Sequence, residues 1–276
     1  MQFIDTYVNI LKYFPSDNFV IESWIEYSKG IAPGLYLKVL NDISEYNFSN
    51  DILPIVKEAI KNKKLLNRIH ESFLSVTKNL NTKFVMYFGK TLDVDVILYL
   101  GLGSGAGWAT SLENKKVILL GIEKIIELKW YDEKMLFALI AHELGHIWHM
   151  ETGGVFHQQN TMREKSVFQL FSEGIAMYFE QKLCENDWFY HQDKVGWLSW
   201  CKTHKSEIKQ EYFFRVQNEI SVQDFFGDWC SYQGYSDVGY FLGCEFIKFL
   251  ISKLSIIQVA KLNNDRLYEE FMLFVQ

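Results

Sequence analysis

The sequence has few of the residues that mark exported or nucleic-acid-binding proteins. Its 276 residues include only 3 prolines and 4 cysteines, and no two cysteines form a Cys-x-x-Cys pair. Scattered cysteines build neither a disulfide framework nor a cysteine zinc site, so they indicate a reducing compartment, and we expect a cytoplasmic protein. Lys and Arg number 28 against 34 Asp and Glu. Because nucleic-acid-binding proteins normally carry a basic face, we expect no nucleic-acid partner.

Long uninterrupted hydrophobic runs are also missing. The charge-free stretch at 96–112 is broken by glycines, so the sequence predicts no membrane span. Segment 1–15 has apolar residues at helical spacing, which predicts a packed amphipathic helix and not a signal peptide. Residues that can form a hydrophobic core are abundant, because 49% of the residues are hydrophobic and 16% are aromatic. A chain of this length fits one large domain or two small ones.

The hydrophobic period changes twice along the chain. It predicts helices up to about residue 80, a small sheet over 83–121, and helices again from 132 to the end. Strands are expected at 83–88, 94–100 and 116–120. We therefore expect an α+β fold, mostly α, with a helical N-terminal region at 1–80 and a second domain at 81–276. Within that domain we expect helices at 132–150 and 161–185 and a helical lobe at 186–276.

One segment carries the residues of a metal site, His142-Glu143-Leu-Gly-His146. Asp132 can cap its helix, on which the two histidines are about 40° apart and about 6 Å along the axis. Both imidazoles can therefore reach one metal ion. Glu143 lies beside that point, where its carboxylate can accept a proton from a metal-activated water. Burying these polar groups on an apolar helix is costly unless something satisfies them.

A zinc site needs a third protein ligand, and Glu173 is the best candidate. It is a glutamate among the apolar residues of the second expected helix, where a buried carboxylate needs a counter-charge. The small Gly174 and Ala176 would let this helix pack closely on the first one. His149 lies about 10 Å along the axis from His142, too far to join the site. His157 follows a glycine break and is the remaining alternative.

The two segments His142–His146 and Glu173-Gly-Ile-Ala176 together resemble the gluzincin metallopeptidases, the clan of thermolysin and the zinc aminopeptidases. Within the clan the chain looks most like predicted zinc-dependent proteases of bacteria, over a stretch from about residue 94 to 250. The resemblance implies a zincin-like domain, one Zn²⁺ per chain bound by His142, His146 and Glu173, and Glu143 as the general base. It also implies a peptide or protein substrate.

The resemblance implies where the substrate lies. In the clan, the strand before the motif helix forms the edge of the substrate cleft and pairs with the bound peptide. Here that strand would be 116–121, with Val117 and Leu119 as substrate-binding residues. The glycine-rich loop before it would form the rim, with Gly107 and Trp108 as further contacts.

A downstream tyrosine in the clan donates a hydrogen bond to the oxyanion. Tyr240, which follows a glycine, is the first candidate here and Tyr235 the second. Two clan features are absent. The G-x-M-E-N signature that anchors a free amine is missing, which argues against a dedicated aminopeptidase. Met177 stands where thermolysin has a histidine-orienting aspartate, and Glu180 is its candidate substitute.

The resulting hypothesis is a zinc-dependent peptidase with no membrane partner; the sequence predicts no oligomeric state. One alternative is a catalytically weak or inactive zincin-fold binding or regulatory module. That module would act through its N-terminal helices, whose aromatics Trp24, Tyr27 and Tyr36 could dock a partner. A third reading is metal-dependent hydrolysis of an amide that is not a peptide.

Overall fold

The computed structural model describes residues 1–153 and 159–276, which form two compact units, Met1–Glu143 and Leu144–Gln276. The described residues are mostly helical and contain one four-stranded sheet, so the α+β, mostly α fold class is confirmed. The division between the units falls inside helix α8 (Glu133–Thr152), which is one continuous helix. It differs from the boundary that we expected between residues 80 and 81.

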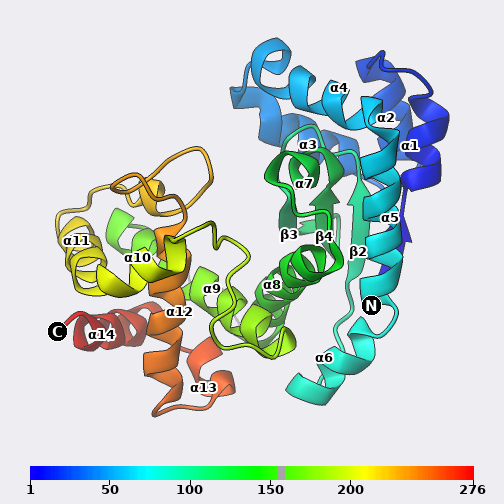
Figure 1. Ribbon diagram of the computed structural model, residues 1–276. Helices are drawn as coiled ribbons and strands as arrows, with labels where there is room; N and C mark the ends of the chain where they lie inside the picture. The colour runs from blue at the N-terminus through cyan, green and yellow to red at the C-terminus, as the bar shows by residue number, and fades with distance from the viewer. Residues whose placement is uncertain (154–158) are drawn as a thin grey trace. The chain divides into compact units, whose positions relative to one another are not determined.

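The first unit contains the whole sheet, whose strand order is β1-β2-β4-β3 (Figure 1). The strands are β1 (Gln2–Asp5), β2 (Asp95–Tyr99), β3 (Gly107–Leu112) and β4 (Lys115–Gly121). β1 and β4 both run parallel to β2, and β3 runs antiparallel to β4. Every residue of β2 is buried, as is typical of a strand covered on both faces. Because β3 is the last strand in the order, it forms one edge of the sheet.

Most helices of the first unit lie between β1 and β2 in the chain, and α7 (Ile122–Leu128) follows β4. The helices between the two strands are α1 (Tyr7–Tyr13), α2 (Ile21–Lys29), α3 (Leu35–Asp42), α4 (Leu53–Lys61), α5 (Lys63–Thr77) and α6 (Leu80–Phe88), with shorter turns at Ile43–Glu45 and Phe48–Ile52. α2 is tied to the end of β2 by two buried aromatic side chains. The Trp24 indole donates to the carbonyl of Leu100 at 2.7 Å, and the Tyr27 hydroxyl accepts from its amide at 2.9 Å.

The burial of Trp24 and Tyr27 contradicts the expectation that these aromatic side chains form a docking surface. Trp24 and Tyr27 have 0% of their surface exposed, because both side chains pack between α2 and the sheet. Tyr36 is half-buried, with the Lys29 amine 5.4 Å from its ring centre. Of the three, only Tyr36 reaches the surface.

Two secondary-structure predictions were wrong. Segment 83–88, expected as a strand, lies in α6, because Leu80 and Phe84 at i and i+4 are buried on one helical face. Segment 1–15, expected as one helix, begins with strand β1, and α1 starts only at Tyr7. The first strand forms because its backbone pairs with β2, as in the bond from the Gln2 amide to the Val94 carbonyl at 3.0 Å.

Among the described residues of the second unit, the regular elements are helices, apart from an isolated β-bridge between Tyr232 and Tyr235. The helical elements are the end of α8, α9 (Met162–Leu183), α10 (Trp197–Thr203), α11 (Lys205–Gln217), a 3-10 turn at Gln223–Phe225, α12 (Val238–Ile251), α13 (Ile256–Ala260) and α14 (Asn264–Val275). α9 begins with a capping box between Thr161 and Glu164. It packs on α12 where two glycines meet: a Cβ atom added at Gly174 would lie 2.3 Å from the carbonyl oxygen of Gly243.

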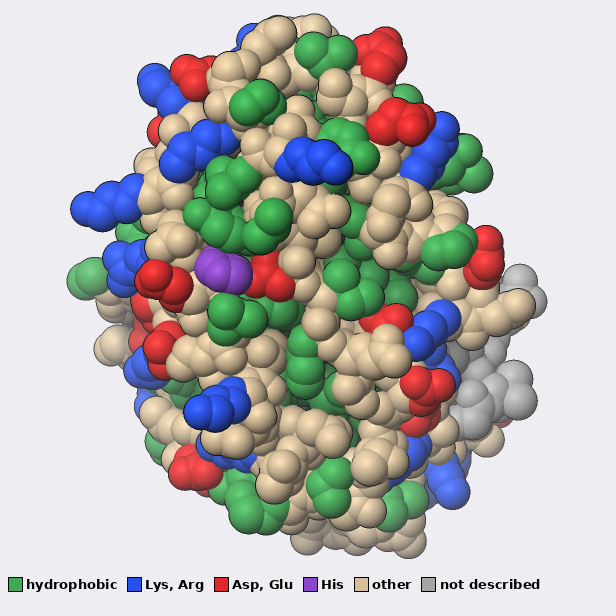
Figure 2. All heavy atoms as spheres, turned by 90° about the vertical axis from the view of Figure 1, so that its right-hand side faces the viewer, with side chains coloured by type: hydrophobic (Ala, Val, Ile, Leu, Met, Phe, Trp, Pro, Cys, Tyr) green, Lys and Arg blue, Asp and Glu red, His purple; other side chains and the backbone are tan. Residues whose placement is uncertain are grey.

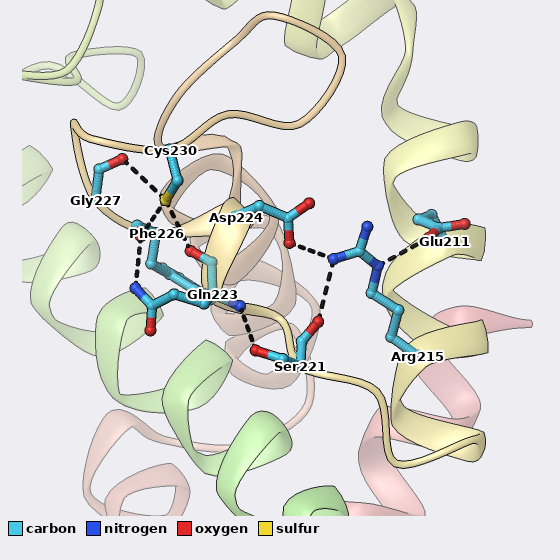
Figure 3. A network of polar contacts seen from close by, with 8 residues as sticks. All are labelled: Glu211, Arg215, Ser221, Gln223, Asp224, Phe226, Gly227 and Cys230. Carbon is cyan, nitrogen blue, oxygen red and sulfur yellow. Dashed lines mark hydrogen bonds and ion pairs between the residues drawn. The ribbon is translucent and has the colours of Figure 1, made fainter.

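A polar network orders the connection between α11 and α12 (Figure 3). Arg215 of α11 pairs with Glu211 at 2.8 Å and with Asp224, and it donates to the carbonyl of Ser221 at 3.1 Å. Further along this connection, the Cys230 thiol donates to the carbonyls of Gln223 and Phe226 at 3.1 and 3.2 Å. These bonds give the backbone of a segment without regular structure its hydrogen-bond partners.

One face of the molecule carries charges of both signs. On the face drawn in Figure 2, Lys and Arg side chains are scattered among Asp and Glu side chains. Within the described ranges, no helix combines the length and apolar character that crossing a membrane would require.

Candidate metal centre

Helix α8 positions the two motif histidines one turn apart. Its start is set by Asp132, whose carboxylate accepts from the Met135 amide at 3.0 Å, as the sequence predicts. Its buried side is apolar: Leu136, Leu139, Ile140 and Leu144. The helix runs from Glu133 to Thr152, close to the expected 132–150.

The third candidate ligand comes from α9. The Nε2 atom of His146 lies 3.4 Å from the Oε2 atom of Glu173. Together His142, His146 and Glu173 offer three ligand atoms that lie within 4.8 Å of one another. Two imidazoles and one carboxylate make a donor set that suits zinc, and other divalent metals also bind such sets. The three residues that the sequence predicts therefore form a group that can hold a metal ion.

Small residues bring the two ligand-bearing helices together, but not quite as expected. A Cβ atom added at Gly145 of α8 would lie 2.7 Å from the Cα atom of Ala176 of α9. Ala176 therefore packs on α8 as expected. Gly174 instead faces Gly243 of α12, so its small size serves a different helix contact.

Ser172 is a site residue that the sequence analysis missed. Its Oγ atom lies 3.3 Å from the Nδ1 atom of His146, while Nε2 of the same ring faces Glu173. A hydrogen bond on the far nitrogen fixes the ring orientation and tautomer of a metal-binding histidine. The sequence signal was weak, because a serine before a glutamate is common.

We expect Ser172→Ala to weaken zinc binding by about 10- to 100-fold, because His146 loses the contact that orients it. Chelator competition would measure the affinity. Ser166→Ala, which removes from the same helix a buried hydroxyl that does not contact His146, is the matched control. Equal zinc affinity of wild type and Ser172→Ala would contradict the orienting role.

Glu143 lies against the edge strand β3. Its Oε2 atom accepts a hydrogen bond from the Ala109 amide at 2.8 Å. A Cβ atom added at Gly107 would lie 2.5 Å from Oε1 of Glu143 and 2.8 Å from Leu139. Only glycine leaves room for the carboxylate at this position. A substrate contact at Gly107 stays a prediction.

The expected edge strand was assigned wrongly. Val117 and Leu119 lie on β4, which pairs with β2 on one side and β3 on the other. Their side chains are 2% and 1% exposed, so they can offer a ligand neither a free backbone edge nor a side chain. The edge is β3, because it is the last strand in the order β1-β2-β4-β3, and it begins at Gly107 within the expected rim loop. Trp108 is on this strand, with the Lys38 amine 4.8 Å from its ring centre.

The glycine loop between β2 and β3 is organised by a buried glutamate. Glu123 of α7 accepts from the amides of Gly101 and Gly103 at 2.8 and 2.7 Å. Burial raises the pKa of this carboxyl, although the two amide hydrogen bonds act in the opposite direction. The two hydrogen bonds to Glu123 hold the backbone of the loop in place just before β3 begins.

The two candidate tyrosines have different surroundings. Tyr235 is stacked on Trp200 of α10, with ring centres 4.2 Å apart. Tyr240, in the first turn of α12, lies edge-on to His191 at 6.4 Å and to Phe226 at 5.6 Å. Neither contact assigns a catalytic role, which stays a prediction for both residues.

A second group of potential ligands is fully buried. His142, Glu180 and His191 also offer three atoms within 4.8 Å of one another. Glu180 contacts the His191 ring at 2.6 Å, from Oε2 to Nδ1, and its Oε1 atom accepts from the His191 amide at 2.9 Å. Glu180 thus orients His191, which is not one of the predicted zinc ligands, and its expected role as the carboxylate that orients a metal-binding histidine stays a prediction. His191 was missed because it lies in a connection with no motif spacing.

The other histidines near the motif differ in status. Burial, with a smaller contribution from His146, lowers the pKa of His149 to about 4, so this ring is neutral at pH 7. It packs edge-on against Phe171 at 5.2 Å. His157 lies outside the described residues.

Comparisons of the chain with protein-family models, with curated proteins and with solved structures found no match.

Proposed function

We propose that this protein is a zinc-dependent peptidase of the gluzincin type. The observation that carries the proposal is the grouping of His142, His146 and Glu173, whose ligand atoms lie within 4.8 Å of one another. Glu143 stands between the two histidines in the chain, with its carboxylate held at the edge of the sheet. A metal site beside a carboxylate that contacts an edge strand suits hydrolysis of an extended peptide.

The chemistry divides between the metal and the chain's own side chains. Zinc held by His142, His146 and Glu173 would supply the Lewis acidity that makes water nucleophilic near neutral pH. Glu143 accepts the proton of the attacking water on its carboxylate and transfers it to the leaving amine. Tyr240 is the candidate donor to the oxyanion.

The proposal predicts chelator-sensitive cleavage of unfolded proteins and about one zinc per chain. Zinc content would be measured by mass spectrometry on protein purified without added metal. Glu173→Ala should lose both the zinc and the cleavage, because it removes a ligand. Glu207→Ala, at an exposed glutamate on α11 of the same unit, should lose neither.

Each other outcome of these experiments would favour a different function or remove the metal site. Zinc without cleavage would favour the binding-module alternative. Cleavage of small amides but not of peptides would favour the third reading. No zinc after reconstitution would overturn the metal site itself.

A further inference from the structure

The outward-facing backbone groups of β3 follow from its pairing with β4. The Gly121 amide donates to the Ala106 carbonyl at 3.0 Å, and the register continues from Gly107 opposite Leu120 to Leu112 opposite Lys115. Hydrogen-bonded and non-hydrogen-bonded pairs alternate along antiparallel strands. Gly107, Ala109 and Ser111 therefore point their amide and carbonyl groups away from β4, along the edge of the sheet.

One of these edge groups is already taken by the candidate general base. Oε2 of Glu143 accepts a hydrogen bond from the outward amide of Ala109 at 2.8 Å. The Glu143 side chain also covers the Cα atom of Gly107. Glu143 is buried in this position. The carboxylate thus lies along the same backbone that an added strand would need.

We propose that Glu143 caps the edge of β3 in the free protein, and that an extended peptide binds by placing its own carbonyl on the Ala109 amide. This inference rests on the proposed function. The ligand class is a peptide segment in extended conformation, because only such a segment presents carbonyls at strand spacing. Binding then moves the Glu143 carboxylate off the strand, so that the base is released only when substrate backbone is in place.

The cap predicts that removing Glu143 makes peptide binding tighter. A bound peptide must replace an existing hydrogen bond in the wild type, whereas in Glu143→Ala the Ala109 amide is open. One hydrogen bond contributes about 0.5–1.5 kcal/mol net, which corresponds to a decrease in Kd of about 2- to 10-fold. A residue that merely helped to bind the peptide would have the opposite effect when removed.

Ala109→Pro isolates the amide at the centre of the proposal. Proline lacks the amide hydrogen, and an edge strand tolerates it where that hydrogen points outward. The amide of residue 109 makes no ladder bond to β4, so pairing of the two strands should survive; thermal melting would verify this. Ser111→Pro is the matched control, because it removes an outward amide that does not contact Glu143.

The test is a double-mutant cycle on peptide affinity. The probe is fluorescently labelled oxidised insulin B chain, measured by anisotropy with chelator present so that no variant hydrolyses it. We expect Glu143→Ala to lower Kd in the wild-type and Ser111→Pro backgrounds but not in Ala109→Pro. Equal tightening in all three backgrounds, or no tightening in any, would overturn the cap.

The cap and the proposed function can fail separately. Chelator-sensitive cleavage combined with an uncoupled cycle would leave the peptidase standing without the cap. Amide exchange followed by nuclear magnetic resonance gives a readout that needs no ligand: the Ala109 amide should lose protection in Glu143→Ala. Unchanged exchange would overturn the cap whatever the activity, and absence of peptide binding in every variant would overturn the extended-peptide assignment.

Discussion

We expect Glu143→Gln to lower the proposed peptide hydrolysis at least about 100-fold while zinc stays bound, because an amide cannot accept the proton of the attacking water. The substitution keeps an oxygen that can accept from the Ala109 amide, so the local structure should be retained. Hydrolysis rate and zinc content would be measured on the same preparation.

The matched control is Glu133→Gln, which makes the same chemical change at the start of the same helix. It should keep full activity. Unchanged hydrolysis in Glu143→Gln would remove Glu143 from the mechanism and leave the zinc site without its base.

The second large effect is expected at the crossing of α9 and α12. Gly174→Ala places a methyl group 2.3 Å from the Gly243 carbonyl and 2.8 Å from Ile247. The backbone atom cannot move aside as a side chain would, so the helices must separate. We expect a loss of about 3 kcal/mol or more in the free energy of unfolding, measured by urea denaturation.

Gly30→Ala is the control for this stability prediction. Its added Cβ would lie no closer than 3.4 Å to its neighbours, which is ordinary contact. We expect a change within about 0.5 kcal/mol. If Gly174→Ala were as stable as Gly30→Ala, the close packing of α9 on α12 would be wrong. Because Gly174 follows Glu173, the same variant should also bind zinc less tightly.

The sequence alone determined the parts of this protein that depend on local periodicity. The helix that carries His142 and His146 was predictable because its cap and apolar face lie within twenty residues. Glu173 was predictable as a candidate because its neighbours Phe171 and Ile175 in α9 are apolar, and a carboxylate among apolar residues needs a partner. The fold class was predictable because the hydrophobic period changes from helical to strand spacing and back along the chain.

Only the tertiary structure decided features that depend on contacts between distant segments. β1 is a strand because β2 lies beside it more than 90 residues later in the chain. The edge of the sheet is β3 and not β4, because strand order follows from pairing and not from composition. Ser172 and His191 acquire their partners in the same way. Local periodicity tells which face of a segment is buried, but the identity of what covers that face is decided by the whole chain.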